Sequence, residues 1–324
     1  MKKIKLTLTL VGLVLASATV VSSCKKKDTT TTPTTTPAQD TNAATASDNT
    51  TAEQQSNDVD NIGAQAIDNG TLSTFRLAGG GLVSPSSSGS YSVTGGSSSG
   101  IVTVTFYNYT GNDGHTRNGS VVYGISPAGT HYRDPSTVVT VSTSTLNPYT
   151  VDNNTVTISK TITNNGLVAA GGNMQWTINS YLSVVKASGG TFTWSASKTH
   201  VLLNTNTTTY NNVNYAAAYT GAANAITWGN TANAAPYNGA IIQINGLASG
   251  TSVDGVNYNV NTTNVVRNHN CTPDALRPHF HPFVAGTISF TPSGKTARII
   301  NFGTGNCDMT YTISIGSWSE TITW

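Results

Sequence analysis

The chain has 324 residues, of which 9% are charged and 37% hydrophobic, compared with about 25% and about 45–50% in ordinary soluble domains. Thr, Ser, Asn and Gly, with 31 Gly, take the place of the missing charged and hydrophobic residues. Because helix-rich proteins and coiled coils need Glu, Lys, Leu and Ala in quantity, this composition excludes both and favours strands with one solvated face. The length allows one large β domain or two small ones.

The formal net charge is +2 at pH 7, but six of the 16 Lys and Arg residues precede Asp28. From Asp28 onward there are 10 Lys and Arg residues and 14 Asp and Glu residues, a net charge of −4. The basic residues of this part are scattered singly along the chain. The sequence therefore carries no basic footprint for nucleic acid.

Residues 1–24 have the pattern of an export signal. Met1–Lys5 is basic, and the apolar run Leu6–Val21 is too short and too diluted by Thr and Ser to predict a membrane-spanning helix. The run ends in Val21-Ser22-Ser23-Cys24, which resembles the lipobox of bacterial lipoproteins, in which the Cys is lipidated and becomes the new N-terminus. We therefore expect acyl chains such as palmitate on Cys24 to anchor the protein. An ordinary signal with a chance Cys is the alternative.

The residues after Cys24 indicate where in the cell the protein is located. Lys25-Lys26-Lys27-Asp28 resembles the short basic start of many lipoproteins of the Bacteroidota, a Gram-negative phylum. Surface-exported lipoproteins of that phylum tend to carry acidic residues here. We expect the protein in the cell envelope, anchored in the outer membrane and facing the periplasm, with surface exposure as the alternative.

Two segments separate the anchor from the β region. Residues 25–46 include the Thr/Pro tract Thr29–Pro37, whose composition predicts a disordered, solvated tether. Residues 47–69 contain Val59, Ile62 and Ala66 at the spacing of one helical face, which predicts a short helical segment.

Residues 71–324 alternate between apolar and hydroxylated side chains with a period of two. In one such run Val156, Ile158 and Ile162 alternate with Thr and Ser, which is typical of antiparallel strands with one buried face. We predict an all-β fold, an antiparallel meander that forms a sandwich or an incomplete barrel. A three-residue turn at Ser188-Gly189-Gly190 would place Val184 opposite Trp194 in the core. Further hairpin turns are expected at Asp254-Gly255, at 292–295 and at Gly316-Ser317.

An ordered series of motifs carries a family resemblance. The series consists of the segments 113–119 and 246–251, then Cys271, then Phe302-Gly303-Thr304-Gly305-Asn306-Cys307-Asp308. With the lipobox, these residues resemble a family of uncharacterised Bacteroidota lipoproteins with a C-terminal FGxGxCD-type motif, from about Ser47 onward. This chain has Asn301 and Thr304 where such proteins usually have aspartates. The resemblance implies fold and localisation, and it brings no known activity.

The cysteines and histidines are the candidate site residues. With Cys24 assigned to lipid, an exported protein is expected to join Cys271 and Cys307 in a disulfide; two free thiols are the alternative. His279 and His281 would share a strand face and could bind one zinc or copper ion, with His269 or Asp274 completing the site. Because Pro278 and Pro282 bracket this segment, a histidine-rich loop without metal is the more common outcome.

Two other patterns have structural explanations in the sequence. Gly96-Ser97-Ser98-Ser99-Gly100 matches the nucleophile elbow of α/β-hydrolases, but a Gly/Ser tract without a following helix predicts a turn. His115 and Arg117 could bind an anion, but we expect a salt bridge with Asp113 in the same turn instead.

These observations favour a membrane-anchored, non-catalytic envelope lipoprotein, which acts as a binding or structural module of unknown ligand. Its partners would be the lipid bilayer and a glycan or an envelope protein, and we expect no cofactor and no nucleic acid. The alternatives are a metal-binding lipoprotein and a metal- or carboxylate-dependent envelope hydrolase. In the hydrolase His279, His281 and Asp308 would carry the chemistry.

Overall fold

A computed structural model describes residues 43–72, 88–111, 114–167, 172–204, 209–210, 213–214, 240–268, 271, 283–308 and 310–323. This part of the chain contains one long helix, α1 (Ala43–Asn69), and one 3₁₀ turn, η1 (Ser97–Ser99). The strands are β1 (Ser88–Gly96), β2 (Ile101–Thr110), β3 (Thr116–Ser126), β4 (Val138–Thr143), β5 (Thr150–Val151), β6 (Asn154–Leu167), β7 (Met174–Val185), β8 (Thr191–Leu202), β9 (Thr209–Tyr210), β10 (Val213–Asn214), β11 (Ile241–Thr251), β12 (Asn257–Asn268), β13 (Phe283–Pro292), β14 (Arg298–Thr304), β15 (Thr310–Ile315) and β16 (Trp318–Thr323).

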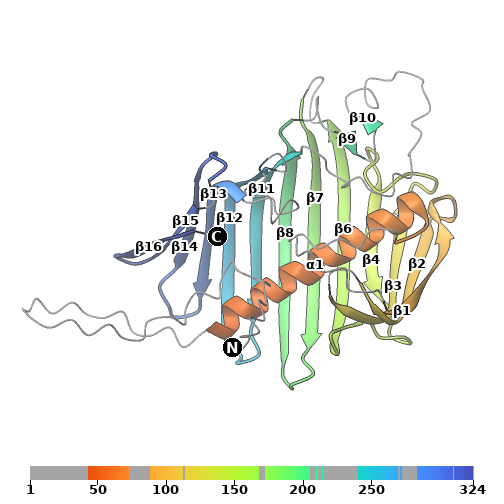
Figure 1. Cartoon of the computed structure of the whole chain (residues 1–324), viewed down its shortest axis with the longest axis horizontal. Coiled ribbons are helices and arrows are strands. Elements are labelled where there is room, and N and C mark those ends of the chain that lie inside the picture. Colours follow the sequence, from red (N-terminus) through yellow and green to blue (C-terminus); the bar gives the residue numbers. More distant parts are fainter. Residues whose placement is uncertain are drawn as a thin grey trace, which may run out of the picture.

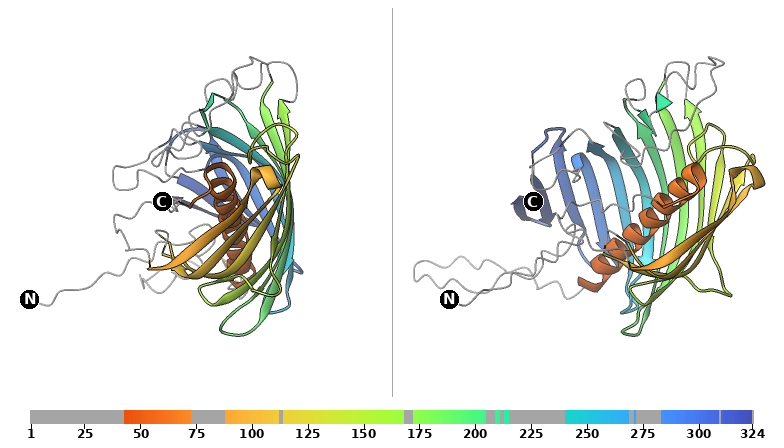
Figure 2. Two further views of the ribbon diagram at one scale, coloured as in Figure 1. Left: turned by 90° about the vertical axis from the view of Figure 1, so that its right-hand side faces the viewer. Right: turned by 45° about the vertical axis from the view of Figure 1, so that its right-hand side comes forward.

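Fourteen strands form one antiparallel sheet with the order β1-β2-β3-β4-β6-β7-β8-β11-β12-β13-β14-β15-β16, in which β5 pairs with both β3 and β6. β9 and β10 pair only with each other. The sheet curves around α1, which crosses its concave face diagonally (Figures 1 and 2). The predicted all-β meander is confirmed. Because the strands lie in one open sheet rather than in two packed ones, the structure selects the incomplete barrel over the sandwich.

The alternation of side chains separates the two faces of the sheet. In β6, Val156, Ile158 and Ile162 are buried on the concave face, while Thr157 and Ser159 are exposed on the convex face. The same pattern buries Trp176 and Trp194 in β7 and β8. A face of large apolar residues therefore lies toward α1, and a face of hydroxyl and amide side chains lies toward solvent.

The turn between β7 and β8 differs from the prediction. Five residues, 186–190, close the hairpin, so that Val184 lies opposite Phe192, and Trp194 lies opposite Leu182. The expected pairing of Val184 with Trp194 is therefore wrong by two residues. The apolar faces still coincide, because five is also an odd number. The hairpins expected at Asp254-Gly255, at 292–295 and at Gly316-Ser317 are formed.

α1 begins at Ala43, four residues before the predicted start, so residues 43–46 belong to the helix and not to the tether. The reason is that Thr45 and Ala46 are already buried against the sheet. The helix also has a larger role than a short segment ahead of the β region. Val59, Ile62 and Ala66 lie in one core cluster with the concave side of the sheet, so α1 supplies one wall of the core.

A smaller cluster lies near the C-terminal edge of the sheet, beyond the main core. It consists of Val265, Ile300, Phe302 and Tyr311. Cys271 is buried and is joined to Cys307 by a disulfide, with the Cα atoms 5.5 Å apart. The bond connects the segment after β12 to the loop between β14 and β15, and so ties together the strands around this cluster.

Candidate functional site: a helix–sheet polar network

The principal polar network of the structure joins the acidic side chains of α1 to basic and aromatic side chains on the concave face. Three lysines of the sheet bind carboxylates at successive positions along the helix. Lys186 Nζ binds Asp48 Oδ1 at 2.5 Å, Lys198 Nζ binds Glu53 Oε1 at 2.5 Å, and Lys160 Nζ binds Asp60 Oδ2 at 2.6 Å. The carboxylates come from α1, and the amines come from β6, from β8 and from the β7–β8 turn.

Lys160 is the most buried of the three lysines. Its ammonium group donates to Asp60 and to the backbone oxygen and Oγ of Ser56, the last two at 2.9 Å. These three acceptors match the three donors of an ammonium group. Burial lowers the pKa of Lys160, and the Asp60 carboxylate opposes this effect. A buried charge with all its donors used holds the helix in place and is not available to a ligand.

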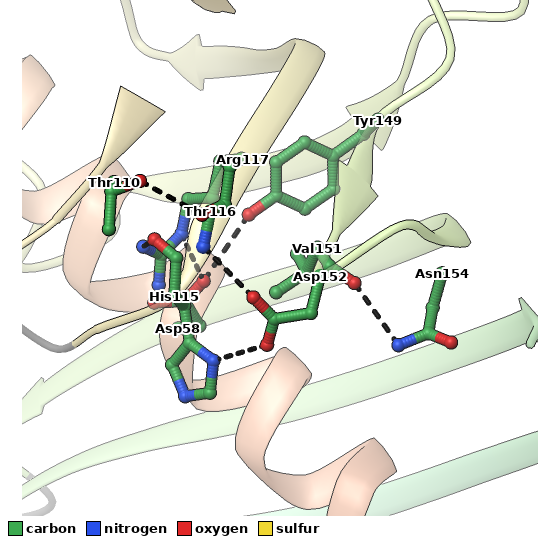
Figure 3. A network of polar contacts seen from close by, with 9 residues as sticks. All are labelled: Asp58, Thr110, His115, Thr116, Arg117, Tyr149, Val151, Asp152 and Asn154. Carbon is green, nitrogen blue, oxygen red and sulfur yellow. Dashed lines mark hydrogen bonds and ion pairs between the residues drawn. The ribbon is translucent and has the colours of Figure 1, made fainter. Parts of the chain in front are cut away.

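Arg117 forms the second anchor of the helix (Figure 3). Its Nε donates to Asp58 Oδ2 at 3.0 Å and its Nη2 to Asp58 Oδ1 at 2.8 Å, the two-pronged geometry that guanidinium and carboxylate groups favour. Tyr149 Oη donates to Asp58 Oδ2 at 3.2 Å. Burial raises the pKa of Tyr149 well above its ordinary value, and the Asp58 carboxylate adds to the rise, so the phenol remains a donor.

Among the described residues, the carboxylate partner of Arg117 is Asp58, a pairing that the sequence did not predict. Asp113 lies outside the described residues. Arg117 has the same strand parity as Val121 and Tyr123, both of which are buried, so its side chain enters the core and needs a buried partner. A signal for this was present in the sequence, because five of the 14 acidic residues fall within the 27 residues of α1.

His115 and Asp152 form an exposed pair next to this anchor (Figure 3). His115 Nδ1 lies 2.6 Å from Asp152 Oδ2, and Asp152 Oδ1 accepts the backbone N–H of Thr116 at 2.9 Å. Asp152 and Asn153 both have positive φ, in the two-residue turn between β5 and β6. Asp and Asn favour this conformation in a tight hairpin. The pair ties the start of β3 to that turn.

Polar contacts continue toward both ends of α1. Near its start, Asn49 Oδ1 accepts the indole N–H of Trp194 at 3.1 Å, and Asp48 Oδ2 accepts the backbone N–H of Val253 at 2.8 Å. Near its end, Asp68 Oδ1 accepts the backbone N–H of Tyr132 at 2.9 Å. The network thus runs from the β11–β12 turn to the β3–β4 loop, so the polar residues of α1 contact much of the concave face.

The structure describes only some of the sequence-predicted site residues. Cys24 and the four candidate metal ligands, His269, Asp274, His279 and His281, lie outside the described residues. Within those residues no group of three or more His, Cys, Asp and Glu side chains is arranged to hold a metal ion. Asp308 accepts the backbone N–H of Thr310 at 3.2 Å, which is a turn contact. The tract 96–100 forms the η1 turn between β1 and β2.

Comparisons of the chain with protein-family models, with curated proteins and with solved structures found no significant match.

Proposed function

We propose that this chain is a lipid-anchored, non-catalytic binding module of the cell envelope. The observation that carries the proposal is the distribution of charge between the two faces of the sheet. In the described strands the charged residues lie on the concave side; they are Arg117, Lys160, Lys198, Arg267, Arg298 and Glu320. Among the described strands and helices, none places a charged side chain on the convex face and none covers that face.

This distribution is the reverse of what solubility requires, because charged residues usually lie on the solvated face. The cost of burying charge on the concave side is offset by the carboxylates of α1, which pair with Arg117, Lys160 and Lys198. α1 thereby occupies the inner surface of the sheet. A partner would then meet the convex face.

The sequence pattern supports the anchor. Cys24 would carry the lipid, and the tether after it would lead to α1. Among the described residues no helix has the length and the apolar character needed to cross a bilayer.

Membrane fractionation of the full-length chain tests the anchor. Replacing Cys24→Ala should move the protein from the detergent-soluble membrane fraction to the soluble fraction, because the acyl chains supply the membrane affinity. The variant Ser23→Ala keeps a small residue before the cysteine and should fractionate like the wild type. A Cys24→Ala protein that stays in the membrane fraction would contradict the proposal.

A panel of chromogenic ester, glycoside and phosphate substrates tests the non-catalytic assignment. We expect no turnover above that of the heat-unfolded protein. His115 with Asp152 is an exposed acid–base pair of the described residues, and His279 belongs to the candidate metal ligands. Turnover that disappears in His115→Ala or in His279→Ala would overturn the assignment and favour the envelope hydrolase.

A further inference from the structure

A shallow groove of about 520 Å³ crosses the convex face over β8, β11, β12 and β13. Its lining includes two cross-strand rows. Ser195, Ser249 and Asn259 form one row, and Ser197, Leu247 and Asn261 form the other. Neighbouring strands are about 4.8 Å apart, and residues i and i+2 of a strand are about 6.8 Å apart. The groove therefore presents rows of hydroxyl and amide groups with Leu247 among them, on a lining whose exposed surface is mainly apolar.

The polar groups of these rows are available to a partner. On other parts of the convex face, hydroxyl groups bind one another, as in Thr105 Oγ1 with Ser120 Oγ at 2.9 Å or Thr312 Oγ1 with Thr321 Oγ1 at 3.3 Å. Within the described part of the chain, the side chains of the two groove rows make no hydrogen bond. The Ser and Asn side chains of these rows can both donate and accept, as a sugar hydroxyl can.

Apolar surface lies among these polar groups. The side chain of Leu247, in the centre of its row, is 62% exposed, and Tyr181, which pairs with Ser195, is 45% exposed. A pyranose ring has an apolar C–H face and a rim of hydroxyl groups, so it can pack on Leu247 or Tyr181 while its rim binds Ser and Asn. A tight protein interface would instead require several aromatic or Arg anchors.

We propose that this groove binds an uncharged polysaccharide. The inference rests on the proposed function, for which it names the class of partner. A polyanion or polycation would find no opposite charge on the described strands of this face, while its own charges would lose hydration on contact. A neutral glycan carries no such cost and matches the alternation of hydroxyl, amide and apolar surface.

The full-length chain, kept in a polyoxyethylene detergent that contains no sugar headgroup, can be tested by affinity electrophoresis. The gels would contain neutral glucan, mannan, xylan or galactan, or the anionic polymers polygalacturonate, alginate and dextran sulfate. We expect at least one neutral polymer to retard the protein and the anionic polymers to have no effect. Retardation should change less than about twofold between 0.05 M and 0.5 M NaCl, because no ion pair contributes.

Matched variants locate the site. Ser249→Asp places a charge in the groove at an exposed position, and we expect it to weaken the binding at least tenfold; Leu247→Ser should weaken it as well. Thr140→Asp places the same charge on β4, on the same face but outside the groove, and should bind like the wild type. Retardation by anionic polymers only, by no polymer at all, or equally in Ser249→Asp and wild type would overturn the inference. The membrane and turnover tests of the proposed function do not depend on this result.

Discussion

At the scale of single residues, two neighbouring acid–base pairs differ in energetic weight. Arg117–Asp58 is buried, and the Arg117 side chain has 1% of its surface exposed. His115–Asp152 is exposed, with 32% and 46% for the two side chains. Exposed pairs contribute about 0–1 kcal/mol to stability. Loss of one partner of a buried pair costs about 3–5 kcal/mol, because a buried charge is left without compensation.

Asp58→Asn is therefore expected to lower the free energy of unfolding by about 3–5 kcal/mol. Asp152→Asn is the matched control. Asn also tolerates the positive φ of that turn, so we expect a loss of at most about 1 kcal/mol. Urea-induced unfolding monitored by tryptophan fluorescence measures both. If both substitutions lowered the free energy of unfolding equally, the buried charge of Arg117 would not need Asp58 as its partner.

A second residue-scale prediction concerns pH. His200 packs against Trp176, with ring centroids 5.4 Å apart. Burial, with the positive charges of Lys198, Arg133 and Lys160, lowers the pKa of His200 well below 6.5. Below pH 6.5 the unfolded chain therefore takes up a proton that the folded chain does not.

Above pH 6.5 His200 is neutral in both the folded and the unfolded chain, and its contribution to stability is complete. As the pH falls from 6.5 toward the lower pKa that His200 has in the folded protein, this contribution is lost. The free energy of unfolding then decreases by up to about 1.4 kcal/mol per pH unit. The measurement is urea unfolding at several values between pH 7.5 and pH 5. His200→Gln cannot titrate, so the slope of the variant should be smaller by that amount. Identical slopes would mean that His200 protonates equally well in the folded protein.

At the scale of elements, the disulfide joins strands that the rest of the core holds less firmly. β14 and β15 contribute Ile300, Phe302 and Tyr311 to the small cluster, and Ile322 of β16 packs against it, whereas β13 also contributes Phe290 to the main core under α1. The bond closes a loop of 36 residues, for which the loop-entropy model gives about 4 kcal/mol. The stabilisation that the disulfide provides should therefore be concentrated at this edge of the sheet.

Replacing Cys271→Ser and Cys307→Ser together is expected to lower stability by up to about 4 kcal/mol. Hydrogen exchange followed by mass spectrometry should show faster exchange in β13 to β16 and little change in β6 to β8. Two alkylatable thiols in the folded, unreduced wild type would contradict the bond. Uniformly faster exchange over the whole sheet would contradict its local effect.

The strands and hairpins were predictable because one face of the sheet is buried and the other is wet, so each strand carries its own period-two signal. The role of α1 as one wall of the core was harder to predict from the sequence. Its large apolar side chains, Val59 and Ile62, lie in its second half, whereas its first half buries Asp48, Asn49 and Ser56 beside the small Ala46 and Ala52. Polar residues enter a core only with partners, and those partners lie between 104 and 205 positions away in the chain.

At the scale of the whole molecule, these long-range contacts make helix and sheet one folding unit. α1 covers Tyr123, Trp176 and Trp194 on the concave face, and all of them lie with it in one core cluster. Without α1, Arg117, Lys160 and Lys198 would lose the carboxylates that compensate their charge. The sheet alone would therefore expose a large apolar surface to water, and the loss of that burial is large compared with the usual margin of stability.

We predict that a chain beginning at Thr71, without α1, fails to fold, whereas a chain beginning at Asp40 folds like the full-length chain. The readouts are solubility, near-ultraviolet circular dichroism and thermal unfolding. The longer chain should show a single transition detected equally by helix and by tryptophan signals, since α1 and the sheet melt together. Two separate transitions, or a native spectrum of the shorter chain, would show that the sheet holds its curvature alone. Recovery of the native spectrum on adding a peptide of residues 43–72 to the shorter chain would support the single unit from the opposite direction, because binding to the folded state stabilises it by mass action.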